Sequence, residues 1–81
     1  MANIRIIRYG VLRYERGNRS ADFNYERVTP VGNVAIYELR HLKWSDLQPI
    51  SVDDYKAIKS EVEGYFLSRR LAPEWVVSSS W

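Results

Sequence analysis

The chain of 81 residues contains no cysteine, a single histidine and only four glycines, none of them beside another. Without cysteine it forms neither a disulfide framework nor a thiolate metal site. The isolated glycines match neither a phosphate-binding loop nor a dinucleotide-binding fingerprint, and no pattern of serine, histidine and carboxylate residues marks an activated nucleophile. We therefore expect a non-enzymatic protein that holds no metal ion and no cofactor.

The one histidine, His41, is the remaining candidate for chemistry. A zinc site needs several ligands at suitable spacing, and the sequence offers no second histidine. As a general base, His41 would need an orienting carboxylate, and Glu38 and Asp46 are the nearest in sequence. We favour the other interpretation, in which His41 is a polar side chain near the end of a strand.

Long apolar segments are absent as well. No apolar run approaches the roughly 18–20 residues that a membrane-spanning helix needs. The first residues lack the apolar stretch and the cleavage site of a secretory signal. These two absences predict a cytoplasmic protein that does not enter the membrane.

What the sequence does contain is typical of a globular protein. Hydrophobic residues make up 46% of the chain and charged residues 27%, a balance that argues against disorder. A chain of this length supports one modest hydrophobic core, so we expect a single domain over residues 1–81. The high aromatic content, 14%, suits a small core because large rings bury much area per residue.

The clearest predicted element is a helix over residues 52–71. Ser51 is a good N-cap, and Asp54 takes the place of the glutamate in a capping box. Pro73 prevents the helix from continuing. Gly64 marks either a close approach of another segment or a plain imperfection. The helical period gathers apolar residues on one face: Val52, Tyr55, Ile58, Val62, Tyr65 and Phe66.

The first forty residues predict three antiparallel strands. Residues 3–15 are rich in β-branched and aromatic residues, but the apolar alternation changes phase along them. We therefore expect one long curved strand with a bulge or bend near Gly10. Turns separate it from two further strands, over residues 22–29 and 34–42. Short connections favour sequential antiparallel pairing.

Residues 72–81 form a tail in which Trp75 begins either a short fourth strand or an arm packed over the sheet. The predicted class is therefore α+β. It consists of a three-stranded antiparallel β-meander, one amphipathic helix packed on one sheet face, and a possible short C-terminal strand. The other sheet face is left open, and we expect function there and at the sheet edges.

The first twenty residues carry five arginines against one glutamate, although the net charge of the chain is only +2. Tyr9 and Tyr14 are interleaved with these arginines, and a bulge at Gly10 would bring Arg8 and Arg13 to one side. Arginines beside aromatic rings suit either phosphates and bases or a protein partner. The alternative is solvated charge paired with Glu15, Asp22 or Glu26. The candidate partner-binding residues are Arg5, Arg8, Tyr9, Arg13, Tyr14, Arg16, Arg19, Trp75 and Trp81.

Two functions fit these observations. The first is a protein-interaction module, an inhibitor or adaptor of a larger complex of the kind encoded by phages and mobile elements. It predicts a contiguous aromatic patch, which a homodimer would also use. The alternative is a nucleic-acid-binding protein that uses the N-terminal Arg/Tyr strand, with an affinity that falls steeply with salt. We favour a protein partner because the net charge is small.

Overall fold

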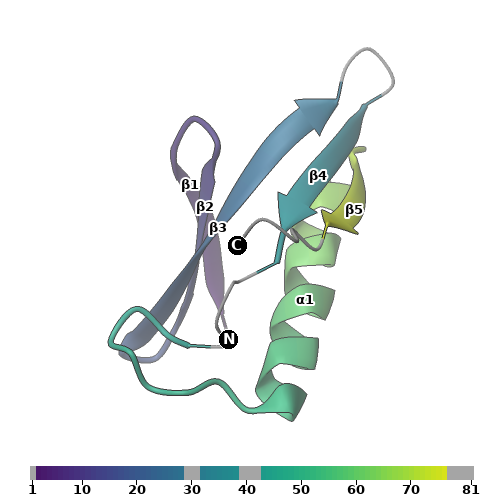
Figure 1. Ribbon diagram of the computed structural model, residues 1–81. Helices are drawn as coiled ribbons and strands as arrows, with labels where there is room; N and C mark the ends of the chain where they lie inside the picture. Colours follow the sequence, from purple (N-terminus) through teal and green to yellow (C-terminus); the bar gives the residue numbers. More distant parts are fainter. Residues whose placement is uncertain (1, 29–31, 39–42, 77–81) are drawn as a thin grey trace.

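The computed structural model of the protein describes residues 2–28, 32–38 and 43–76, which form one mixed sheet and one helix (Figure 1). The elements follow one another as β1 (Asn3–Arg8), β2 (Val11–Arg16), β3 (Arg19–Val28), β4 (Asn33–Tyr37), α1 (Val52–Leu67) and β5 (Ala72–Val76). The spatial order of the strands is the same as their order along the chain. The predicted α+β class is confirmed, whereas the three-stranded meander understates a sheet of five strands.

The predicted long strand over residues 3–15 is wrong, because the chain reverses within it. β1 and β2 pair as an antiparallel hairpin whose turn lies at Tyr9 and Gly10. Gly10 has φ +85°, a left-handed conformation that glycine adopts without steric cost. A β-bulge does occur, but it lies between Ile6 and Arg8 of β1. The reversal and the bulge together explain the change of apolar phase.

β3 is ten residues long and joins the two halves of the sheet. Residues 19–24 pair with β2, and residues 25–28 pair with β4 on the opposite edge of β3. The predicted strand over residues 22–29 therefore begins three residues too late, and its last residue lies outside the described residues. Of the strand predicted over residues 34–42, positions 39–42 likewise lie outside them.

The possible C-terminal strand exists as β5 and pairs parallel to β4, so that α1 is the crossover between two parallel strands. The helix begins where predicted, since the Ser51 side chain accepts a hydrogen bond from the Asp54 backbone N–H. It ends at Leu67 rather than at residue 71, because Arg70 takes a left-handed φ of 61°. The Leu71 N–H then donates to the Phe66 carbonyl and closes the helix end.

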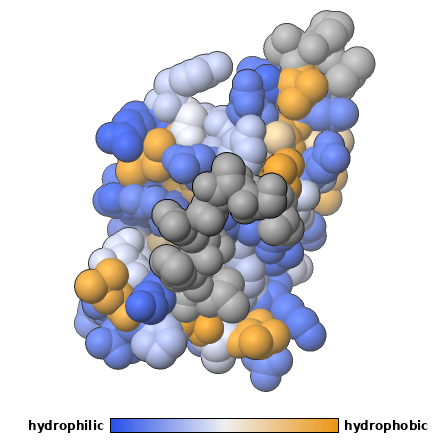
Figure 2. All heavy atoms as spheres, viewed as in Figure 1, coloured by the Kyte–Doolittle hydropathy of each residue, from blue (hydrophilic) through white to orange (hydrophobic). Residues whose placement is uncertain are grey.

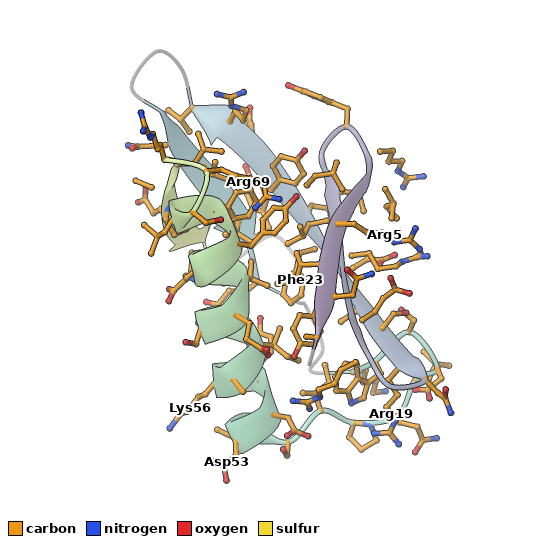
Figure 3. All side chains as sticks on the ribbon, turned by 180° about the vertical axis from the view of Figure 1, so that it is seen from behind. Arg5, Arg19, Phe23, Asp53, Lys56 and Arg69 are labelled. Carbon is orange, nitrogen blue, oxygen red and sulfur yellow. The ribbon has the colours of Figure 1, made fainter. Side chains whose placement is uncertain are left out.

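The core lies between one face of the sheet and α1, where Figure 3 shows Phe23. Leu12 and Tyr14 of β2 point into it, whereas Arg13 between them is only half-buried, as the period of a strand requires. Val52 at the start of α1 is exposed, so its predicted place on the packed face is wrong. The core residues are Leu12, Tyr14, Ala21, Phe23, Val34, Ile36, Trp44, Ile50, Tyr55, Ile58, Val62 and Phe66.

The opposite face of the sheet, here called the outer face, points away from α1. The described residues that are visible in Figure 2 are mostly hydrophilic, with apolar ones among them. The exposed large apolar side chains of the described residues are likewise spread over several elements. Tyr9 is the only aromatic residue among them. The described residues therefore do not form the contiguous aromatic patch that we expected.

Candidate functional site

Three of the five N-terminal arginines share the outer face of the sheet. Arg5 lies directly opposite Arg13 in the register of β1 and β2. The bulge after Ile6 then places Arg8 opposite Val11, two residues before Arg13. Residues that face each other across two strands, and residues two apart on one strand, project from the same side. Arg5, Arg8 and Arg13 therefore lie on one face, and Figure 3 shows Arg5 on the side of the hairpin away from α1.

Two of these three arginines are already paired with carboxylates. The Arg5 Nε lies 3.1 Å from a Glu15 carboxylate oxygen. Arg13 makes a bidentate contact, in which its Nε and Nη2 donate to the two Asp22 oxygens at 2.8 and 3.1 Å. The hydrogen bond to Asp22 raises the pKa of Arg13 above its ordinary value. Both pairs are solvent-accessible, so they stabilise the fold only slightly, but they neutralise much of the charge of this face.

The other two arginines lie at the turn between β2 and β3, around a buried tryptophan. The Arg16 and Arg19 guanidinium carbons lie 5.6 and 5.9 Å from the centre of the Trp44 ring. Arg16 also lies 3.2 Å from Asp54 at the start of α1, and Arg19 lies 4.0 Å from Asp46. Trp44 is only 3% exposed. We call these five residues the Trp44 cluster; they attach the connector before α1, and α1 itself, to the sheet.

Arg8 and Tyr9 stand apart from these contacts. Together with Gly10 they form the turn of the β1–β2 hairpin, here called the hairpin tip, at the opposite end of the molecule from Arg19 (Figures 1 and 3). Tyr9 is 90% exposed. The Arg8 side chain makes no hydrogen bond or ion pair with any described residue. The tip backbone is nevertheless held, because the Tyr25 N–H donates to the Gly10 carbonyl at 3.0 Å.

Tyr14 leaves the candidate binding surface. It points into the core, where its ring lies 6.4 Å from that of Trp44 and its hydroxyl donates to the Glu61 carboxylate of α1. Burial, and secondarily the hydrogen bond to Glu61, raises the pKa of Tyr14 to about 12. Its interleaving with arginines in the sequence therefore reflects the alternation of a strand, with Tyr14 inside and Arg13 outside.

Trp75 has a packing role in β5. Its ring meets Phe23 edge to face at 5.8 Å, and its Nε1 donates to Glu63 of α1 at 2.8 Å. The Lys59 ammonium lies 5.0 Å above the Trp75 ring and 2.9 Å from Glu38. These contacts hold β5 and α1 together, so only part of the Trp75 ring remains accessible. Trp81, the other candidate from the tail, lies outside the described residues.

The sequence interpretation missed the role of Trp44. The tryptophan directly follows the basic Lys43 and precedes a polar connector, so no periodicity marks it as a core residue. The next residue, Ser45, donates its backbone N–H to the Ser20 carbonyl and so holds the connector beside the start of β3. The burial of Trp44 therefore depends on the pairing of segments that are distant in the sequence.

The described residues offer little to a small ligand or a metal ion. Nowhere in residues 2–28, 32–38 and 43–76 do three histidine, cysteine, aspartate or glutamate side chains gather as metal ligands would. That part of the chain also shows no pocket. No helix within it is long and apolar enough to span a membrane. His41 lies outside the described residues.

Comparison with known proteins adds no relative. No family model matches the chain, and neither a curated protein nor a solved structure is significantly similar to it. We therefore infer function from the fold and from the placement of its side chains.

Proposed function

We propose that the protein is a small, non-enzymatic protein-binding module, an inhibitor or adaptor, and that its recognition element is the hairpin tip. The observation that supports this most is Tyr9, which is 90% exposed beside an arginine without a partner among the described residues. Tyrosine and arginine are the residue types that most often carry the binding energy of protein interfaces. A hydrogen-bonded turn presents them at little entropic cost on binding.

The charge distribution favours a protein over a nucleic acid. Four of the five N-terminal arginines lie within 4.0 Å of a carboxylate, whereas Arg8 has no carboxylate this near among the described residues. A polyanion gains affinity from cations that are free to meet phosphates. On the outer face it would instead meet Glu15 and Asp22 beside every paired arginine. A protein surface of mixed charge is compatible with such a face.

The alternative, nucleic-acid binding, would depend on the cations that remain free. Arg27 of β3 and Arg70 after α1 are exposed and, like Arg8, form no ion pair among the described residues. They lie toward the same end of the molecule as the hairpin tip, where β3 and α1 both end (Figure 1). Lys43, Lys56 and Arg69 likewise form no ion pair among the described residues, but Arg69 lies over the Tyr65 ring and Figure 3 shows Lys56 near the start of α1. The free cations are therefore dispersed, unlike the clustered basic footprint of dedicated binders.

The test is to capture partners with immobilised protein, purify the partner and measure its affinity for tip variants. Tyr9→Ala should weaken binding by about thirtyfold or more, as expected for a hot-spot residue. Arg8→Ala should weaken it less. The matched control is Leu47→Ala, which truncates a side chain that is 74% exposed in the connector before α1.

Two results would refute the proposal. If Tyr9→Ala binds the purified partner as tightly as the wild type, the hairpin tip is not the recognition element. If Leu47→Ala weakens binding as much as Tyr9→Ala, the loss does not report on the tip. Circular dichroism of each variant shows whether the fold is retained.

A further inference from the structure

We propose that the protein forms a symmetric dimer in which β1 pairs antiparallel with β1 of a second copy. β1 is an edge strand: β2 lies on one side of it, and no described residue pairs on the other. An uncovered edge presents a row of unpaired backbone N–H and C=O groups that another strand can extend. The inference concerns an edge rather than the hairpin tip, so it does not rest on the proposed function.

The two edges of the sheet differ in how well they are protected. β5, at the far edge, contains Pro73, which cannot donate a backbone hydrogen bond. β1 contains no proline and no lysine, and its residues on the core side, Ile4 and Ile6, are both apolar. Ile6 is 40% exposed although its neighbour on β2, Leu12, is fully buried. The core side of this edge is therefore apolar, and no proline interrupts it.

The bulge in β1 limits where a second strand fits. Bulges twist an edge away from further pairing, and this one lies between Ile6 and Arg8. The usable edge is therefore Ala2 together with the regular segment from Asn3 to Ile6. The centre of these five residues is Ile4.

Symmetry and charge then select one register. A two-fold axis through such a pair requires core-side residues to face core-side residues, so the axis passes through a single position. With Arg5 on the axis, two arginines would lie directly opposite each other, which is unfavourable. With Ile4 on the axis, Ile4 faces its own copy and Ile6 faces Ala2. On the outer face Asn3 then faces Arg5 of the second copy, beside the Glu15 carboxylate to which Asn3 donates.

Such a dimer has a definite architecture. The two sheets become continuous, and both copies of α1 cover the same face because paired residues share a side. The hairpin tips point in opposite directions, since the two β1 strands run antiparallel. The dimer would thus present two copies of the tip at opposite ends.

The first experiment measures association by sedimentation over protein concentrations up to about 1 mM. Ile6→Lys places a charge in the apolar row of the edge, and the fold should tolerate it because Ile6 is partly exposed. The control is Leu67→Lys, the same kind of change at a residue of α1 that is 60% exposed. The dimer dissociation constant should rise at least about tenfold in Ile6→Lys and stay within about twofold in Leu67→Lys.

A wild type that stays monomeric over this range would overturn the proposal. So would a dimer that Ile6→Lys leaves intact or that both variants weaken equally.

The second experiment tests the register by cross-linking, which is simple in a chain without cysteine. Ile4→Cys places one thiol on the axis, where opposite Cβ atoms of a strand pair lie about 4.5–5.5 Å apart, close to disulfide distance. Mild oxidation should give a covalent dimer for Ile4→Cys and none for Leu67→Cys. Cross-linking of Arg5→Cys without cross-linking of Ile4→Cys would contradict the register, and equal cross-linking of Leu67→Cys would contradict specific pairing.

Discussion

The two turns at opposite ends of β2 are built from similar residues and do different things. Each turn has an arginine and a glycine, and the glycine has a positive φ. The residues are Arg8 and Gly10 in one turn and Arg16 and Gly17 in the other. At the β2–β3 turn the arginine meets Trp44 and the start of α1. At the hairpin tip no described residue makes a hydrogen bond or an ion pair with the Arg8 side chain. Residue type alone therefore does not separate a structural arginine from a free one; the distant segments that cover it do.

The sharpest way to break this comparison is to truncate the aromatic residue at each end. Trp44→Ala should lower the free energy of unfolding by about 3–5 kcal/mol, since it removes a buried ring and leaves a cavity. Tyr9→Ala should change it by about 0.5 kcal/mol or less, because the ring is almost wholly in water. Denaturant titration of both variants measures the difference. Similar losses would show that the hairpin tip is also part of the packed structure.

A second substitution tests the hydrogen bond between Tyr14, on the core side of β2, and Glu61 of α1. Tyr14→Phe removes the hydrogen bond to Glu61 and should cost about 1–2 kcal/mol at neutral pH. The folded pKa of Tyr14, about 12, lies above the unfolded value of about 10. The stability that Tyr14 contributes is therefore complete below about pH 10 and is lost as the pH rises toward about 12.

The measurement for Tyr14 is the free energy of unfolding of wild type and Tyr14→Phe across that alkaline range. The wild type should lose stability more steeply, because only it contains the titrating phenol at this position. Parallel curves would contradict the assignment of the raised pKa to Tyr14. The other tyrosines are present in both proteins and cancel in the comparison.

The smallest expected effect separates a paired arginine from the unpaired one. A double-mutant cycle on Arg13→Ala and Asp22→Ala should give a small favourable coupling, as expected for a solvent-accessible pair. Arg8→Ala should change stability by less than about 0.5 kcal/mol. Thermal unfolding at low and high salt measures both, and salt should weaken the Arg13–Asp22 coupling. A larger loss in Arg8→Ala would reveal a contact of Arg8 that stabilises the fold.

The sequence predicted α1 best because the signals that set its start are local. Ser51 and Asp54 are three residues apart, and their hydrogen bond forms as the spacing indicates. The helix end was placed too far along the chain, since Pro73 is a strong stop but not the first one. The helix ends earlier because the Arg70 backbone is left-handed, and an arginine in the sequence does not predict that conformation.

The strands were harder to predict because their partners are distant. The apolar alternation changes phase near Gly10 whether the chain bends there or reverses direction. The pairing of Ile4 with Tyr14 shows that it reverses. The sequence does not decide whether residues 72–76 form a strand or an arm, because a parallel strand reached through a helix gives no turn signal of its own.

Composition pointed to the N-terminal arginines. The structure does place Arg8 and Arg13 on one side, but the expected cause, a bulge at Gly10 in one long strand, is wrong, because β1 and β2 form a hairpin. The carboxylate partners Asp46 and Asp54 lie far along the chain, and the sequence alone does not place them beside Arg19 and Arg16. The sequence predicts Tyr14 on the surface because the alternation of a strand shows which residues share a face, but not which of the two faces is buried.

The most direct test of the central claim, that carboxylates neutralise most of the N-terminal arginines, is a titration with nucleic acids. DNA and RNA, both duplex and single-stranded, are added to the purified protein at low and moderate salt, with tryptophan fluorescence and gel mobility as readouts. The account predicts no saturable binding even at low salt, since Arg5, Arg13, Arg16 and Arg19 are already paired. Saturable binding that weakens as salt increases would contradict it and make the surface that carries these arginines a nucleic-acid surface.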